Sequence, residues 1–139
     1  MIDVKRLSPG DGALIAAAGY LFDDQPRPEA VNRFLADDRN HIFIAYEDGE
    51  PVGFVSGVEL THPDKGTEMF LYELAVDERH HRRGIGTTLV KALANIAQQR
   101  GCYDMWVLTD ADNEAALGTY RKSGADREST HVMLTWPFS

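Results

Sequence analysis

Residues 69–90 read MFLYELAVDERHHRRGIGTTLV, and two structural signals meet in this stretch. Residues 69–76 are apolar and rich in β-forming side chains, with Glu73 as the only charge, so they predict a mostly buried strand. Across residues 84–100 the apolar side chains recur at helical spacing, which predicts an amphipathic helix packed on a core. A short basic turn containing two glycines joins the two elements.

This basic turn, residues 79–86, has the composition of an anion site. The first turn of a helix leaves backbone N–H groups without intrahelical partners, and the helix dipole adds partial positive charge there. Gly84 and Gly86 allow a phosphate to approach the backbone, and the arginines add charge. In the alternative, the glycines only tighten a turn and the arginines are solvated. The strand before and the helix after favour the phosphate interpretation.

Length and composition predict one soluble globular domain spanning residues 1–139, with 43% hydrophobic and 26% charged residues. No apolar run approaches the ~20 residues of a membrane span, and the N-terminal residues lack a signal-peptide core. Cys102 is the only cysteine, which excludes an intrachain disulfide and fits a reducing cytoplasm. The formal charge of −8 argues against bulk nucleic-acid binding. It suits either cationic substrates or simple solubility.

Taken along the chain, the patterns predict the element order β-α-α-β-β-β-α-β-α-β. Helical crossovers in this order favour an α/β fold with a mixed sheet and helices on both faces. Gly53 and Gly57 lie within one predicted strand and indicate a bulge or close packing. The predicted strands are residues 2–7, 41–46, 52–60, 69–76, 103–109 and 128–136. The predicted helices are residues 12–22, 29–36 and 84–100, and a last helix that starts within residues 110–113 and runs to about residue 122.

The turn resembles the signature of the GNAT superfamily of acyl-CoA-dependent N-acetyltransferases, Gln/Arg-x-x-Gly-x-Gly/Ala after a strand that ends in Leu-x-Val. Residues 81–86, HRRGIG, fill that frame after LAV at residues 74–76, with His81 where Gln or Arg is usual. The resemblance implies the GNAT fold, whose fourth and fifth strands splay to admit the pantetheine arm. It also implies acetyl-CoA as the cofactor, contacted by Leu74, Ala75, Val76, His81, Arg82, Arg83, Gly84, Ile85, Gly86, Thr87, Asn113 and Tyr120.

A second motif, NEAALGTYRKSGA at residues 113–125, is similar to the GNAT pattern Asn-x-x-Ala-x-x-x-Tyr-x-x-x-Gly-Phe. Asn113, Ala116, Tyr120 and Gly124 match, and Ala125 stands in place of Phe. The resemblance implies that Asn113 contacts the cofactor arm and that Tyr120 protonates the leaving CoA thiolate, as a phenol can. The alternative for Tyr120 is a helix aromatic that packs into the core.

Glu73 is the candidate general base. A carboxylate within an apolar strand is costly to bury unless it is paired or lines a cavity. Acetylation needs a neutral attacking amine, so a base beside the acetyl group has a clear task. The alternatives are a wet edge position and an ion pair with an arginine.

Within the superfamily the sequence resembles aminoglycoside 3-N-acetyltransferases, which carry a Tyr-Asp-Leu-Ala-Val strand, a His-Arg-Arg turn, an acidic loop and a short last strand containing His. Residues 72–76, YELAV, have Glu73 in place of that Asp, and residues 131–134 read HVML. The implied function is acetylation of an aminoglycoside antibiotic, at its 3-amino group, giving resistance. The expected substrate contacts are Asp23, Asp24, Tyr72, Glu73, Asp110, Asp112 and Glu114.

Several alternatives stay open. Asp23 and Asp24 also suit a solvated loop after a helix, and Asp110 and Asp112 also suit helix caps. A GNAT enzyme for a polyamine, an amino acid or a protein N-terminus competes with the aminoglycoside enzyme, as does a non-catalytic acyl-CoA-binding module. Neighbouring His80 and His81 lack ligand partners, so no metal site is predicted. Cys102 is read as a small core residue. A homodimer, common among such relatives, is a further expectation.

Overall fold

The computed structural model describes residues 1–139, which form one mixed sheet flanked by helices. The strands are β1 (Ile2–Arg6), β2 (Asn40–Glu47), β3 (Glu50–His62), β4 (Gly66–Val76) and β5 (Met105–Val107). The helices are α1 (Gly12–Ala17), α2 (Pro28–Ala36), α3 (Ile85–Gln99) and α4 (Glu114–Lys122), with 3-10 turns η1 (Gly19–Leu21) and η2 (Glu78–His80). None of these helices combines the length and the apolar composition that a membrane span requires.

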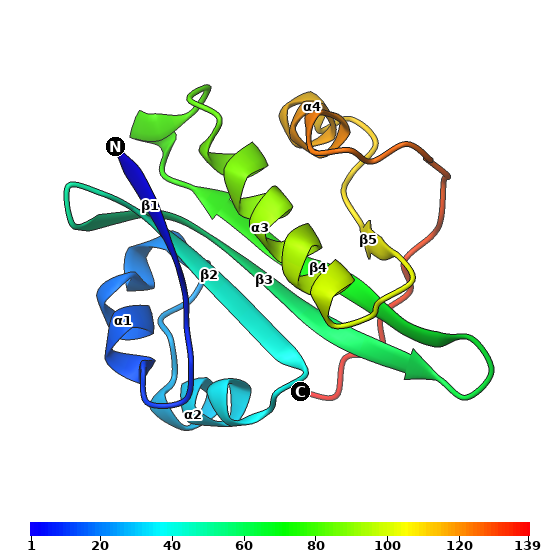
Figure 1. Ribbon diagram of the computed structural model, residues 1–139, viewed down its shortest axis with the longest axis horizontal. Helices are drawn as coiled ribbons and strands as arrows, with labels where there is room; N and C mark the ends of the chain where they lie inside the picture. Colours follow the sequence, from blue (N-terminus) through cyan, green and yellow to red (C-terminus); the bar gives the residue numbers. More distant parts are fainter.

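The strands lie in the order β1-β2-β3-β4-β5. Neighbours from β1 to β4 are antiparallel, whereas β4 and β5 are parallel because α3 crosses between them. The hairpin between β2 and β3 turns at Asp48 and Gly49, whose φ angles of 53° and 82° suit a tight hairpin. Figure 1 shows α3 on one face of the sheet and α1 and α2 on the other, so the predicted mixed sheet with helices on both faces is confirmed.

The apolar stripe of α3 forms the larger core against the sheet. Leu89 and Leu93 are fully buried, and each contributes about 1.5–3 kcal/mol by leaving water. Gly57 lies under Leu93, because a Cβ there would stand 2.8 Å from a Leu93 methyl group. The pairing register of β3 with β4 also shifts between Ser56 and Gly57. Both the close packing and the bulge expected from the strand glycines are therefore present.

The opposite face carries a smaller core under α1 and α2, centred on Ile44 and Phe54. Phe22 stacks on Phe54 with ring centroids 4.1 Å apart. The predicted helix over residues 12–22 is wrong in its second half, because α1 ends at Ala17 and Gly19 begins a separate 3-10 turn. Glycine disfavours helix continuation, and the break carries the chain toward the sheet.

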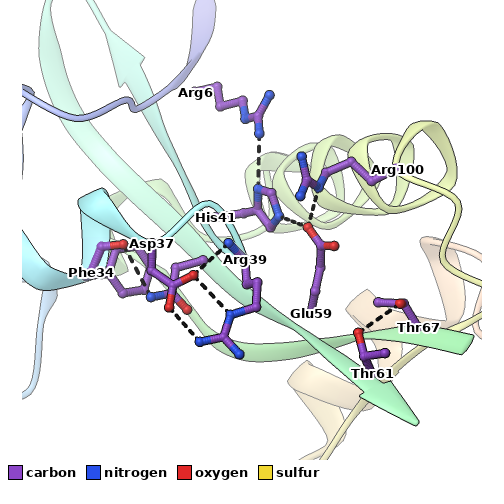
Figure 2. Close-up of polar contacts among 10 residues, drawn as sticks. Arg6, Phe34, Asp37, Arg39, His41, Glu59, Thr61, Thr67 and Arg100 are labelled. Atoms are coloured by element: carbon purple, nitrogen blue, oxygen red, sulfur yellow. Dashed lines mark hydrogen bonds and ion pairs between the residues drawn. The ribbon is translucent and has the colours of Figure 1, made fainter. Parts of the chain in front are cut away.

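A polar network is buried where β1, β2, β3 and the end of α3 meet (Figure 2). His41 and Glu59 are 2% and 8% exposed, and His41 Nε2 lies 2.6 Å from Glu59 Oε2. Arg6 Nη2 donates to His41 Nδ1 at 3.1 Å, and Arg100 pairs with the same Glu59 carboxylate. Since Nδ1 accepts from a guanidinium, the ring is neutral and its proton is on Nε2.

Two strand predictions are corrected near the C-terminus. The strand expected over residues 103–109 is only Met105–Val107. Tyr103 and Asp104 still make backbone hydrogen bonds to Thr67 and Met69 of β4, whereas residues 108 and 109 make none to β4. The strand expected over residues 128–136 is absent. Residues 126–139, called the tail below, make no backbone hydrogen bond, and a strand without a partner is not stable in water.

Candidate active site

The outer edge of β4 is open where the sheet would otherwise continue. Only Met69, Phe70 and Leu71 pair with β5, so the edge from Tyr72 to Val76 has no strand beside it. The bulge in the β3–β4 register leaves Tyr72 without a partner on the other side as well. Figure 1 shows β5 standing beside the middle of β4 and away from its arrowhead. Apart from the carbonyl oxygen of Val76, which contacts His81, backbone groups on this edge are free to bind an extended chain that carries amides.

The start of α3 follows directly from this open edge and presents unpaired donors. Gly84 is its N-cap in the left-handed conformation, with φ of 79°, and no side chain caps the helix. Arg82, two residues earlier, also has a positive φ of 66°. The N–H groups of Ile85, Gly86 and Thr87 therefore remain available to an anion. A Cβ at Gly84 would meet nothing within 4 Å, so the space beside this residue is open.

The three arginines of the turn differ in whether they form an ion pair within the chain. Arg83 pairs with Glu47 on β2 at 2.7 Å, and Arg79 pairs with Asp77 at 2.8 Å. These pairs hold the pKa of Glu47 below its usual value and that of Asp77 at about 2. Arg82 forms no ion pair and is left as the free cation of the turn. The sequence motif alone did not show that two of the three arginines are neutralised within the chain.

His81 fixes the turn to the end of β4. Its Nε2 lies 2.8 Å from the carbonyl oxygen of Val76, so the ring donates to the backbone. Gly86 has a packing task as well, because a Cβ there would stand 3.2 Å from Thr119 Cγ2 on α4 and 3.7 Å from Val76 Cγ2. The end of β4, the start of α3 and the middle of α4 therefore meet at one point.

Glu73 lies half-buried on the face of the sheet that α1 and α2 partly cover. Ser56 Oγ donates to Glu73 Oε1 at 3.3 Å, and no arginine pairs with the carboxylate. Burial raises the pKa of Glu73, the Ser56 hydroxyl lowers it, and the charge of Asp23 raises it. The expected alternative of an arginine ion pair is absent, and the carboxylate is placed to accept a proton.

Tyr120 lies on α4, and its partly buried side chain packs against the larger core that α3 forms with the sheet. Its hydroxyl makes no hydrogen bond within the chain, and burial raises its pKa, so it stays protonated at neutral pH. Asn113 is the N-cap of α4, and its Oδ1 accepts from the N–H of Ala116 at 3.1 Å. Its side-chain N–H groups remain unbonded within the chain.

The acidic residues lie on two separate loops. Asp23 and Asp24 are exposed and line a recess together with the end of α1 and η1, and the charge of Asp23 raises the pKa of Glu73. Asp110 and Asp112 are exposed between β5 and α4, and Glu114 is exposed as the first residue of α4. The cap expected from Asp110 or Asp112 is supplied by Asn113 instead. Tyr72, 66% exposed, lies beside Glu73 in sequence and packs edge-on against Phe70.

Two residues of the site escaped the sequence analysis. Ser56 is a polar residue within an apolar strand, as Glu73 is, and that shared oddity is the signal that would have found it. Glu47 ends β2 and carries no comparable signal, because its partner is 36 positions away. No three His, Cys, Asp or Glu side chains are close enough together to hold a metal ion. Cys102 is partly buried, with its pKa raised by burial, as a core thiol should be.

Known proteins resemble this chain in sequence or in fold. N-alpha-acetyltransferase RimI of Mycobacterium tuberculosis is 32% identical over 115 residues, which is 83% of this chain and 70% of the relative. The structure of aminoglycoside acetyltransferase HMB0005, from an uncultured soil metagenomic sample, is 32% identical, with a TM-score of 0.81 and 99% of both chains covered. Aminoglycoside acetyltransferase meta-AAC0020, from a similar sample and in complex with sisomicin, shares the fold at 22% identity with a TM-score of 0.86, covering 98% of this chain and 97% of the other.

The model of the Acetyltransferase (GNAT) family matches residues 11–125, a range that contains the open β4 edge, the uncapped start of α3 and Tyr120. The family match and the shared fold together show that this chain belongs to the GNAT family of acetyltransferases, enzymes that use acetyl-CoA.

Proposed function

We propose that this chain transfers the acetyl group of acetyl-CoA to an amino group of an aminoglycoside, at the 3-amino position. The observation that carries the substrate class is the likeness to HMB0005, an aminoglycoside acetyltransferase that matches over nearly the full length of both chains. The 3-amino position rests on the resemblance of residues 72–76 and 131–134 to 3-N-acetyltransferases. Resistance to such antibiotics would follow in a cell that makes this chain.

The open edge and the uncapped helix fit the shape of acetyl-CoA. We assign the amides of its arm to the backbone of Leu74, Ala75 and Val76, and to the free side-chain amide of Asn113. We assign its pyrophosphate to the backbone N–H groups of residues 83–87, with the Arg82 side chain as the added charge. His81 and the Arg83–Glu47 pair hold this turn in place. When bound, acetyl-CoA supplies an activated acetyl thioester.

Glu73 and Tyr120 are assigned the two proton transfers. Glu73 takes a proton from the substrate ammonium, directly or through one water, so that a neutral amine attacks the acetyl carbon. Its raised pKa brings it nearer to neutrality, where a base is most effective. Tyr120 gives a proton to the departing sulfur, for which its raised pKa keeps it in the acid form.

The substrate cleft is assigned to the face that Glu73 shares with Asp23. Two exposed acidic loops would attract a polycation, with Asp23 and Asp24 on one side and Asp110, Asp112 and Glu114 on the other. Tyr72 offers an exposed aromatic surface beside Glu73 for a sugar ring. Asp23 is the carboxylate of these loops whose charge raises the pKa of Glu73, so Asp23 is the first to test.

A second candidate function is acetylation of a protein N-terminus. The likeness to RimI, whose name describes N-alpha-acetylation, favours it at the same 32% identity, although that match covers less of both chains. A peptide substrate offers one α-ammonium, whereas an aminoglycoside offers several charges. The two acidic loops therefore favour the aminoglycoside.

The test is release of CoA thiol from acetyl-CoA with gentamicin-like aminoglycosides, spermidine and short peptides. We expect turnover with aminoglycosides at least about 100-fold above peptides, judged by kcat/KM. NMR of the product assigns the acetylated nitrogen. Turnover of peptides alone would support the RimI-like function and overturn the substrate proposal, while acetylation at another ring nitrogen would overturn only the 3-amino assignment.

A further inference from the structure

Three aromatic side chains lie together on the face of β4 and β5 that α3 does not cover. Phe70 pairs with Trp106 in the parallel register, and their rings stack with centroids 4.3 Å apart. Tyr72 packs edge-on against Phe70, with ring centroids 5.5 Å apart. Met69 and Leu71 belong to the larger core under α3, and since side chains alternate along a strand, Phe70 points to the opposite face. Phe70, Tyr72 and Trp106 are called the aromatic face below.

The aromatic face stays accessible. Figure 1 shows α1 and α2 near β1 and β2, away from β5, and the smaller core under these helices takes only Ala75 from β4 and nothing from β5. Tyr72 is 66% exposed, and Phe70 and Trp106 are only partly buried. The five large apolar side chains of the tail remain 72–95% exposed, so they are not packed onto this surface. Aromatic rings gathered on one accessible patch indicate a binding surface.

The aromatic face adjoins the proposed base. Ser56 lies two residues after Phe54 of the smaller core and donates to Glu73, so Glu73 lies on the same face of the sheet. Tyr72 precedes Glu73 directly, and Phe70 is three residues before it, about 10 Å along an extended strand. A molecule that presents an amine to Glu73 can therefore extend its next ring over the aromatic face.

Charge and ring chemistry together select the occupant. The faces of aromatic rings attract cations, and tryptophan does so most strongly. The carboxylates of Glu73 and Asp23 add negative charge at one end of the aromatic face. A ring of an aminoglycoside carries both ammonium groups and apolar C–H groups, so it complements both features. A linear polyamine has the charge without the ring.

We propose, on the basis of the proposed function, that the aromatic face is a second acceptor subsite, which binds the ring next to the one whose amine is acetylated. Trp106 is the specificity-determining residue of this subsite, and Tyr72 lies between the two rings. The subsite favours acceptors with two or more linked rings over single-ring and linear amines.

The binding test uses the two tryptophans of the chain, Trp106 and Trp136. Trp136→Phe leaves Trp106 as the only indole. In the presence of CoA, which cannot donate an acetyl group, the fluorescence of Trp106 should change saturably with gentamicin. The apparent affinity for spermidine, or for 2-deoxystreptamine as a single ring, should be weaker on the order of 10-fold. Trp106→Phe with Trp136 retained is the matched control and should show no change.

Steady-state kinetics provide the second readout. Trp106→Leu keeps an apolar side chain but removes the ring, so the KM for gentamicin should rise on the order of 10-fold with little change in kcat. The KM for 2-deoxystreptamine should stay near the wild-type value. Trp106→Phe should recover most of the lost affinity, and Trp136→Leu, the same exchange in the tail, should behave as the wild type. Circular dichroism shows whether each variant is folded.

The two readouts separate this subsite from the proposed function. A saturable change in Trp106 fluorescence without acetylation of gentamicin would support the subsite while the proposed function fails. Acetylation of gentamicin with unchanged fluorescence and a wild-type KM in Trp106→Leu would overturn the subsite alone. An equal rise in KM for gentamicin and 2-deoxystreptamine would reduce Trp106 to a packing residue and would overturn it. So would a fluorescence change that follows protein concentration, because another copy of the chain would then cover the aromatic face.

Discussion

His41 is a buried histidine whose neutral form is required by its neighbours. Arg6 faces its Nδ1, and burial lowers its pKa from 6.5, although Glu59 opposes the shift. The unfolded chain therefore takes up a proton before the folded chain does. The stability that this group contributes is complete above about pH 6.5 and is lost as the pH falls toward the lowered pKa of the folded state.

The prediction is that the free energy of unfolding falls between pH 7.5 and 5.5 more steeply in the wild type than in His41→Gln. Glutamine can still contact Arg6 and Glu59 but cannot titrate. At pH 7.5 the variant should be less stable by about 1–3 kcal/mol, the usual cost of disturbing a buried polar contact. Urea unfolding at each pH provides the values. Parallel pH dependences for the two proteins would show that His41 does not titrate in this range.

For Tyr120, a catalytic role and a packing role predict different effects of the substitution Tyr120→Phe on kcat. Its hydroxyl has no hydrogen-bond partner within the chain, so Tyr120→Phe removes no internal contact. As a general acid it should lose about 10²–10⁴-fold in kcat with little change in KM. Steady-state kinetics decide between the two roles. Wild-type kcat in Tyr120→Phe would leave Tyr120 as a core aromatic only.

At the scale of elements, the proposed anion site at the start of α3 can be tested with one substitution there and a matched control substitution just beyond the other end of the helix. Gly84 and Gly101 have φ angles of 79° and 82°, and a Cβ at either position meets nothing within 4 Å. Gly84→Asp should raise the Kd for acetyl-CoA at least about 100-fold, because it sets a negative charge at the anion site. Gly101→Asp imposes the same backbone strain and charge at the far end of α3 and should bind normally. Calorimetry of the folded variants gives both values, and equal affinity in the two would remove the anion site from the start of α3.

The spacing of apolar residues predicted the elements whose formation depends mainly on their local sequence. The hairpin of β2 and β3, the buried strand β4 and the amphipathic α3 are visible as patterns of apolar residues and turn glycines. The tail carries a comparable strand pattern and forms no strand. Pairing depends on an available edge, which a local pattern does not contain.

The backbone features of the site could be predicted from the sequence, but most of its side-chain contacts could not. The glycine turn between β4 and α3 shows in the spacing of Gly84 and Gly86. The pairing of Arg83 with Glu47, which leaves Arg82 as the free cation, joins two elements remote in sequence. Such contacts depend on the sheet order, so they could not be read from the turn alone.

At the scale of the whole molecule, the net charge of −8 and the two acidic loops make a prediction about salt. The KM for an aminoglycoside should rise as the ionic strength increases from roughly 0.05 to 0.5 M, because attraction of a polycation to the cleft is screened. The double variant Asp23→Asn with Asp24→Asn should show a weaker rise. A KM that is constant with salt in the wild type would indicate that these loops do not attract the substrate.

The most direct test of the account is the pH dependence of kcat/KM for one aminoglycoside in the wild type, Glu73→Gln and Ser56→Ala. The wild type should lose activity as the pH falls through the raised pKa of Glu73. Ser56→Ala removes a hydrogen bond that lowers this pKa, so its acidic limb should move to higher pH. Glu73→Gln should lose about 10²-fold or more in kcat/KM, while its affinity for acetyl-CoA stays near that of the wild type. Its remaining activity should follow only the substrate's own ammonium group. An unchanged acidic limb in Glu73→Gln would contradict the account, because the base would then lie elsewhere than on β4.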